Sequence, residues 1–219
     1  MKAYVIAIKD CEPSQKAAER CIKSAAVFSS IQVDPFHAVT PRDKPEAFLK
    51  SEGIPLAGFK GPYSRWDNVL SCFSSHYKLW KMCAEGKQDF LIFEHDAVVN
   101  NEIKDVNFQG ILSYGHPSYG EYKIPPYIGV NKLVSKEYLP GAHAYRIKPY
   151  AARVLIQEAK ILAGPTDLFI SNRRFPFIEE YYPWPVSALD TFTTVQKEKG
   201  CLSKHSYRKN PDSYDILKI

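Results

Sequence analysis

The chain has 219 residues, of which 45% are hydrophobic and 24% charged, and its formal net charge is +5. This length and apolar content suit one domain with a substantial core, and they exclude large-scale disorder. We therefore expect residues 1–219 to form a single domain. The modest positive charge favours nucleotides, nucleic acid or acidic membranes as partners, but it does not select one of them.

The cysteines and the first residues of the chain indicate a reducing compartment of the cell. The number of cysteines is odd, and their spacings match no zinc-binding pattern. Two of them lie in an apolar stretch typical of buried thiols. The first residues enter a strand pattern directly and lack the features of a signal peptide. No apolar run approaches the ~20 residues that cross a bilayer. We expect a soluble cytoplasmic protein. The cysteines are Cys11, Cys21, Cys72, Cys83 and Cys201.

The first third of the chain predicts a β-α-β unit followed by a long loop. An apolar strand over 4–8, a helix over 15–29 and a second strand over 31–39 are typical of an α/β fold. Residues 40–65 are rich in proline and glycine and predict a loop, with a short helix at 45–51. Long loops in compact domains tend to be functional.

The rest of the chain continues the alternation of helices and strands. Apolar residues at helical spacing predict a helix over 66–83, which ends before Gly86, and an uninterrupted apolar strand follows at 90–93. Later strands are expected at 110–115 and 141–147, helices at 149–163 and 165–170, an inserted loop or hairpin at 116–140, an irregular segment at 175–187 and a basic C-terminal segment at 200–219.

An acidic run, Glu94-His95-Asp96, follows the strand predicted at 90–93. Side chains two residues apart on an extended chain point to the same side, so Glu94 and Asp96 are expected to lie together. Two such oxygen donors suit Mn²⁺ or Mg²⁺, which can bridge the phosphates of a nucleotide. The alternative interpretation is a pair of acids that faces water at a strand end. Ligand sites in open α/β sheets lie at such strand ends, which supports the metal interpretation and leaves both interpretations open.

The preceding helix carries three polar side chains, Ser74-Ser75-His76, in an otherwise apolar pattern. By itself His76 is interpreted as a hydrogen-bonded core histidine. Because one helix–strand unit joins it to the acidic run, His76 and Glu94 are also expected to line one crevice.

Four segments together resemble glycosyltransferase family 25, which includes lipopolysaccharide sugar transferases and collagen galactosyltransferases. Its pattern has Ser-His and Leu-Trp on a helix, an apolar strand ending in Glu-Asp-Asp, a Gly-x-x-Ala-Tyr strand and a Pro-Val-Asp element. The corresponding segments here are 71–80, 90–97, 141–152 and 165–170, and the order agrees over about residues 4–195.

The resemblance implies a GT-A-like nucleotide-binding sandwich, with a mixed, mainly parallel sheet flanked by helices. It implies a hexosyl- or pentosyltransferase that uses a nucleotide-sugar donor, Mn²⁺ or Mg²⁺, and an inverting displacement. Glu94 and Asp96 match the outer members of the metal motif, whereas His95 replaces its middle aspartate. Donor contacts are expected from Ile8, Ser75, His76 and Glu94, and from Arg65, which precedes the helix.

An inverting reaction needs a general base for the acceptor hydroxyl. Asp167 matches the later aspartate of the family, and Asp190 is the second candidate, with a helix cap as its alternative role. His205 is the candidate that completes the metal shell, and a place in a solvated basic tail is its alternative.

Three functions remain open at this stage. The first is transfer of a sugar to a saccharide. The second is transfer to a hydroxymethylated base in DNA, as in phage-type enzymes, which the basic composition and the absence of an anchor allow. The third is a degenerate transferase fold that only binds, because His95 interrupts the acidic motif.

Overall fold

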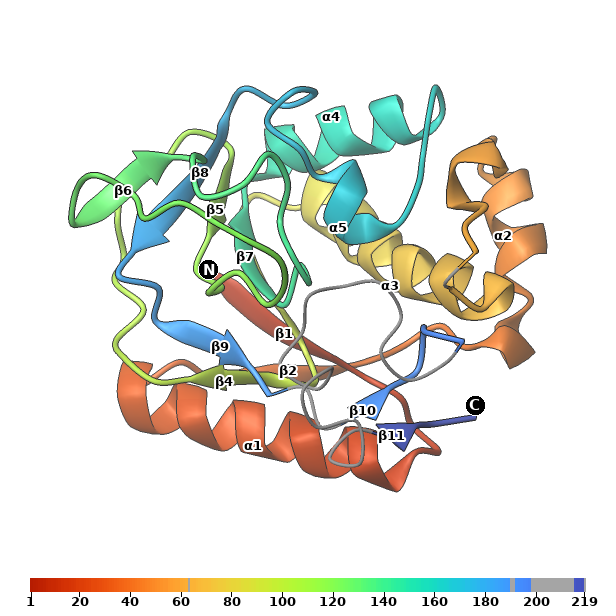
Figure 1. The fold of residues 1–219 in the computed structure, drawn as a ribbon, viewed down its shortest axis with the longest axis horizontal. Helices are drawn as coiled ribbons and strands as arrows, with labels where there is room; N and C mark the ends of the chain where they lie inside the picture. The colour runs from red at the N-terminus through yellow and green to blue at the C-terminus, as the bar shows by residue number, and fades with distance from the viewer. Residues whose placement is uncertain (63, 190–191, 198–214, 219) are drawn as a thin grey trace.

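The computed structural model describes residues 1–62, 64–189, 192–197 and 215–218 (Figure 1). The described helices are α1 (Glu12–Ser29), α2 (Pro45–Ser51), α3 (Trp66–Glu85), α4 (Pro149–Ala159) and α5 (Thr166–Phe169), with short 3-10 turns at Pro41–Asp43 and Ala57–Phe59. The described strands are β1 (Lys2–Ala7), β2 (Asp34–His37), β3 (Phe90–Glu94), β4 (Ala97–Val99), β5 (Ile111–Ser113), β6 (Gly129–Lys132), β7 (Ala144–Ile147), β8 (Ile178–Tyr182), β9 (Val186–Ala188), β10 (Phe192–Thr193) and β11 (Asp215–Ile216).

Seven strands form one mixed sheet in the order β2-β1-β3-β7-β5-β8-β6. The predicted α/β class is therefore confirmed. The expectation of a mainly parallel sheet is wrong, because three pairings are parallel (β1 with β2, β1 with β3, β5 with β8) and three are antiparallel. Strand β7 causes the difference, since it runs antiparallel to both β3 and β5 in the middle of the sheet.

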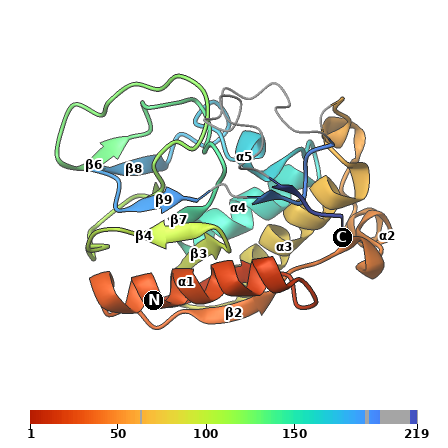
Figure 2. The same ribbon diagram turned by 60° about the horizontal axis from the view of Figure 1, so that its bottom comes forward.

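The sheet separates two apolar layers, and strand alternation assigns each side chain to one of them. Phe90 and Ile92 of β3 face α3 and α4, where Trp80 lies in the same core cluster. Leu91 and Phe93 face the layer that contains α1. Figures 1 and 2 show α1 on one side of the sheet and α3 with α4 on the other. This arrangement buries β3 on both faces and leaves its carboxyl end as the place where polar side chains emerge.

Two predicted loop regions contain strands. The segment 175–187, predicted to be irregular, contains β8 and the start of β9, because its prolines lie beside the strand rather than within it. Segment 116–140 includes β6, which pairs with β8 rather than within the segment. Strand β4 directly follows the acidic run and pairs with β9. In the described parts of the chain, no helix is both long and apolar enough to cross a membrane.

Candidate functional site

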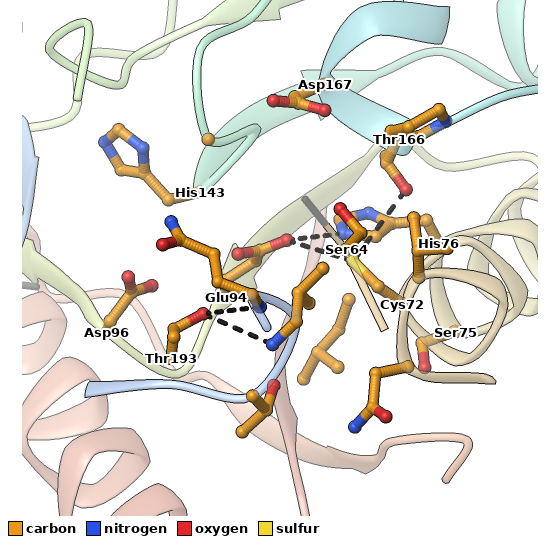
Figure 3. Close-up of a pocket in the computed structure, with 18 of the residues that line it drawn as sticks. Ser64, Cys72, Ser75, His76, Glu94, Asp96, His143, Thr166, Asp167 and Thr193 are labelled. Atoms are coloured by element: carbon orange, nitrogen blue, oxygen red, sulfur yellow. Dashed lines mark hydrogen bonds and ion pairs between the residues drawn. The ribbon is translucent and has the colours of Figure 1, made fainter. Parts of the chain in front are cut away.

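A cavity of about 780 Å³ opens where the parallel strands β1 and β3 end. This volume lies within the range of small-molecule and cofactor sites. Its walls come from the ends of β1 and β3, one face of α3, the loop at 118–121, the start of α5 and residues 192–196. Ile8, Ser75, His76, Glu94, Asp96 and Asp167, all predicted as site residues, line it. Figure 3 shows Glu94 pointing toward His76 and Cys72, with Asp96, His143 and Asp167 around the same space.

Glu94 is held by a chain of hydrogen bonds that starts in the core. Its Oε1 atom lies 3.0 Å from Nε2 of His76. A carboxylate only accepts, so Nε2 carries the proton and Nδ1 is the acceptor in the neutral ring. The hydroxyl of Tyr145 donates to that Nδ1 at 2.9 Å and accepts from Nε1 of Trp80 at 2.8 Å. Burial lowers the pKa of His76 to about 3, so the ring is neutral at ordinary pH.

Cys72 joins His76 and Glu94 in a compact group. Within the described residues, this thiol, imidazole and carboxylate place their ligand atoms within 4.8 Å of one another. Burial, and then the charge of Glu94, raises the pKa of the Cys72 thiol. The thiol is thus protonated, and Nε2 of His76 also carries a proton. Both atoms would have to lose a proton to bind a metal ion, so the group is better described as a hydrogen-bonded support for Glu94.

His95 uses its side chain for packing. Ser14 Oγ accepts from the backbone nitrogen of Ile8 at 2.9 Å and lies 3.0 Å from Nδ1 of His95. The imidazole stacks on Phe192, with ring centroids 5.1 Å apart. Burial lowers the pKa of His95 to about 4, which keeps the ring neutral. The middle position of the acidic run therefore connects the start of α1 to β10.

Asp167 lies at the start of α5, beside the loop at 118–121. Its Oδ2 accepts a short hydrogen bond from the hydroxyl of Tyr119, and its Oδ1 accepts from the backbone nitrogen of Leu168 at 3.0 Å. Burial raises the pKa of Asp167, whereas the bond from Tyr119 opposes that rise. The result is an oriented carboxylate that takes up a proton more readily than an exposed aspartate.

Ser75 and Ile8 position the end of β2 and the start of α1. Ser75 Oγ accepts from the backbone nitrogen of Val39 at 2.9 Å and donates to the carbonyl of Ser71 at 2.9 Å. The carbonyl of Ile8 accepts from the side chain of Gln15 at 2.8 Å. Both residues line the cavity, but the Ser75 hydroxyl is already used to hold Val39 in the wall.

Arg65 was expected to contact the donor, but it is not among the residues that line the cavity. Its guanidinium donates to the carbonyl of Thr194 and, at 2.6 Å, to that of Leu217. Its backbone nitrogen also donates to the carbonyl of Val195 at 2.8 Å. Arg65 thus ties the start of α3 to β10 and β11, while its neighbour Ser64 lines the cavity. Because its guanidinium is used by two backbone carbonyls, we do not assign Arg65 a phosphate contact.

Two predicted residues, Asp190 and His205, lie outside the described residues.

The cavity wall also contains residues for which the sequence predicted no role. His143, within the Gly-x-x-Ala-Tyr segment, packs so closely on Gly115 that a Cβ there would come within 2.6 Å of its ring. Tyr119 was not singled out, because it lies in a segment without a periodic pattern. The position of His143 two residues before Tyr145 was the one available signal.

Comparison with known proteins identifies the family. Residues 1–123 match the family model described as glycosyltransferase family 25 (LPS biosynthesis protein), which is more than half of the 219 residues. The chain belongs to glycosyltransferase family 25. No curated protein matches it. The matched range includes α3 and the Glu94-to-Asp96 run, whereas His143 and Asp167 lie beyond it. Membership of family 25 implies a glycosyltransferase, with a sugar donor and an acceptor as substrates.

Proposed function

We propose that this chain transfers a sugar from a nucleotide-sugar donor to a hydroxyl of a saccharide acceptor, with inversion and with the help of Mn²⁺ or Mg²⁺. The observation that carries the proposal is that Glu94, Asp96 and Asp167 line one cavity at the carboxyl end of β3. This cavity is large enough for a nucleotide sugar, and its acids stand where α/β sheets bind ligands.

The donor set fits a hard divalent cation. Glu94 and Asp96 offer carboxylate oxygens, which Mn²⁺ and Mg²⁺ prefer. The bonds from His76 and from the Cys72 thiol both fall on Oε1 of Glu94, and a carboxylate has about four lone-pair sites. When bound, the ion neutralises the charge that develops on the leaving nucleoside diphosphate.

Asp167 is the general base in this proposal. As the acceptor oxygen bonds to the anomeric carbon and the bond to the diphosphate oxygen breaks, the hydroxyl proton passes to Asp167. Tyr119 holds the carboxylate in one orientation by its hydrogen bond. This proton transfer requires a carboxylate, and not an amide, at position 167.

A saccharide is preferred to DNA as the acceptor, because the support for DNA was the basic composition and the absence of an anchor, and neither of these selects a nucleic acid. Of the basic residues after position 190, Lys197 and Lys218 belong to the described residues. The description of the matching family model, an LPS biosynthesis protein, also favours a saccharide acceptor.

The decisive experiment measures donor hydrolysis and transfer with a panel of nucleotide sugars, with Mn²⁺ and after its removal with EDTA. We expect activity that depends on the metal and is lost in Asp96→Ala. The matched control is Asp34→Ala, which removes an exposed acid at the start of β2. Equal activity in Asp96→Ala and Asp34→Ala would refute the metal role. The degenerate, binding-only alternative predicts no turnover of any donor in the panel.

A further inference from the structure

Four aromatic side chains gather beside the cavity: His116, Tyr122, Tyr182 and Trp184. The ring of Trp184 lies 5.0 Å from that of His116, 5.6 Å from Tyr122 and 5.1 Å from Tyr182, measured between centroids. The rings of His116 and Tyr122 are 5.1 Å apart. We refer to these four residues as the aromatic cluster. The rings meet at steep angles of 81° to 89°, so they brace one another edge to face.

The aromatic cluster adjoins the wall of the cavity that carries Asp167. Glu121, a wall residue, directly precedes Tyr122, and Ser118, another wall residue, follows His116 by two positions. Two residues of chain span at most about 7 Å, so the backbone of His116 and Tyr122 lies within about 7 Å of the wall. Tyr119 lies between them and donates its hydroxyl hydrogen to Asp167. The aromatic cluster is thus on the side of the proposed base.

Trp184 is fixed by a buried carboxylate that the proposed reaction does not use. Its Nε1 donates to Oε2 of Glu180 at 3.1 Å, and Glu180 is only 1% exposed. The other oxygen of Glu180 accepts from the backbone nitrogens of Val134 and Ser135, each at 2.7 Å. These bonds hold the indole in one orientation relative to β8.

Part of the aromatic cluster is exposed to solvent. Tyr122 is 39% exposed, and its hydroxyl lies 3.0 Å from Nε2 of His116. Trp184 and His116 are half-buried. A rigid, partly exposed group of aromatic rings binds flat apolar surfaces at a low entropic cost. The C–H faces of pyranose rings are such surfaces.

We propose that the aromatic cluster is an acceptor subsite that binds an internal sugar ring of an oligosaccharide whose terminal hydroxyl lies at Asp167. This inference rests on the proposed function and adds to it the class of acceptor, a chain of at least two sugars rather than a monosaccharide. Tyr122 and Trp184 supply the stacking surface, and Glu180 positions Trp184.

The test compares one-ring and multi-ring saccharides by saturation-transfer NMR and by tryptophan fluorescence of the full chain. The one-ring probes are methyl galactoside and methyl glucoside, and the multi-ring probes are lactose, lacto-N-tetraose and cellotetraose. We expect at least one multi-ring probe to bind more tightly than both one-ring probes. Tyr122→Ala should weaken that probe about tenfold, the change produced by losing about 1.4 kcal/mol of stacking.

Tyr127→Ala is the matched control, because Tyr127 belongs to the same loop and is 73% exposed. Trp184→Phe is the second variant, since it keeps a ring but removes the bond to Glu180. Circular dichroism and the melting temperature verify the fold of each variant. Binding of one-ring probes should stay unchanged in all of them.

The inference is overturned if no saccharide binds, if multi-ring probes bind no better than one-ring probes, or if Tyr122→Ala and Tyr127→Ala have equal effects. Binding of an oligothymidine in place of every saccharide also overturns it. Donor hydrolysis with Mn²⁺ separates this failure from that of the proposed function. If hydrolysis persists, only the acceptor subsite is wrong, and if hydrolysis is absent as well, the proposed function fails with it.

Discussion

The imidazole of His76 donates from Nε2 to Oε1 of Glu94 across 3.0 Å. Through its other nitrogen, the same ring bonds to Tyr145 in the core, so His76 connects the core to the candidate metal site. His76 is itself oriented by Tyr145, which accepts from Trp80. The direction of each bond follows from the donor that starts the chain and the carboxylate that ends it. The orientation of Glu94 therefore depends on residues that never touch the cavity.

Tyr145→Phe tests this dependence. The substitution removes the partner of Trp80 Nε1 and of His76 Nδ1, and both of these residues are 0% exposed. We expect a loss of about 1–3 kcal/mol in the free energy of unfolding, because buried polar groups remain without partners. Metal affinity at Glu94 should fall by roughly 10–100-fold, as for other outer-shell contacts. Urea denaturation and calorimetric titration with Mn²⁺ measure the two effects.

Tyr127→Phe is the control for Tyr145→Phe, since it removes the hydroxyl of a tyrosine that is 73% exposed. Equal stability of the two variants would show that the hydrogen-bond chain is dispensable. Lower stability of Tyr145→Phe with unchanged Mn²⁺ affinity would restrict the chain to a role in folding.

His95→Asp restores the acid that family 25 carries at the middle of the motif. Here the position is filled by a neutral ring that contacts Ser14 and stacks on Phe192. A carboxylate at this position loses the stacking and must be desolvated, so we expect a lower melting temperature. Mn²⁺ affinity should rise by less than about tenfold, because the side chain is directed to α1 and β10. His95→Asn is the control that removes the ring without adding charge. A gain of more than tenfold in affinity would contradict this assignment.

Gly58→Ala tests a close backbone contact. A Cβ on Gly58 would lie 2.0 Å from the carbonyl oxygen of Ala163, and backbone atoms cannot turn aside as a side chain does. The turn at Ala57–Phe59 also packs Phe59 against Phe73 of α3, with ring centroids 5.0 Å apart. We expect a destabilisation of about 1–3 kcal/mol in urea denaturation.

Gly61→Ala, three residues further on, is the matched control for Gly58→Ala. A Cβ there meets nothing within 4 Å, and the backbone needs no positive φ. The change should be neutral or stabilising by up to about 1 kcal/mol, because alanine restricts the unfolded chain. Similar stabilities of the two variants would show that the segment around Ala163 yields easily.

The sequence predicted the elements whose patterns are local. The apolar run of β3, the amphipathic pattern of α3 and the proline at the start of α4 are each sufficient by themselves, and the structure confirms them. Strand β8 was missed because Pro176 and Pro183 flank it and its sequence, Ile178–Tyr182, has charged residues. Its pairing with β5 and β6 comes from distant parts of the chain, which no local pattern reveals.

In the candidate site, too, the sequence predicted residues that belong to local patterns and missed contacts that depend on the tertiary structure. Glu94, His76 and Asp167 were found because each belongs to a recognisable segment, and the structure places all three around one cavity. Arg65 was interpreted from its charge and its place before the helix, although its guanidinium is used by the carbonyls of Thr194 and Leu217. Tyr119 reaches Asp167 from an irregular loop, and such a contact depends on tertiary structure only.

The pH dependence of transfer tests Asp167 as the general base. Its ordinary pKa is 3.8, and burial raises this value in the folded protein. A base must be ionised to accept a proton, so activity is fully present above the raised pKa and is lost as the pH falls through it. We expect the acid limb of kcat/KM to have its midpoint above 3.8.

Asp167→Asn should lower kcat by roughly 10²–10⁴-fold. Donor binding should change little, because the amide keeps the size of the side chain, and the acid limb should disappear from the residual activity. Tyr119→Phe removes the hydrogen bond that favours the carboxylate, so it should move the acid limb to higher pH while activity at the plateau is largely kept. An acid limb that stays in place in both variants would assign the proton transfer to a different group.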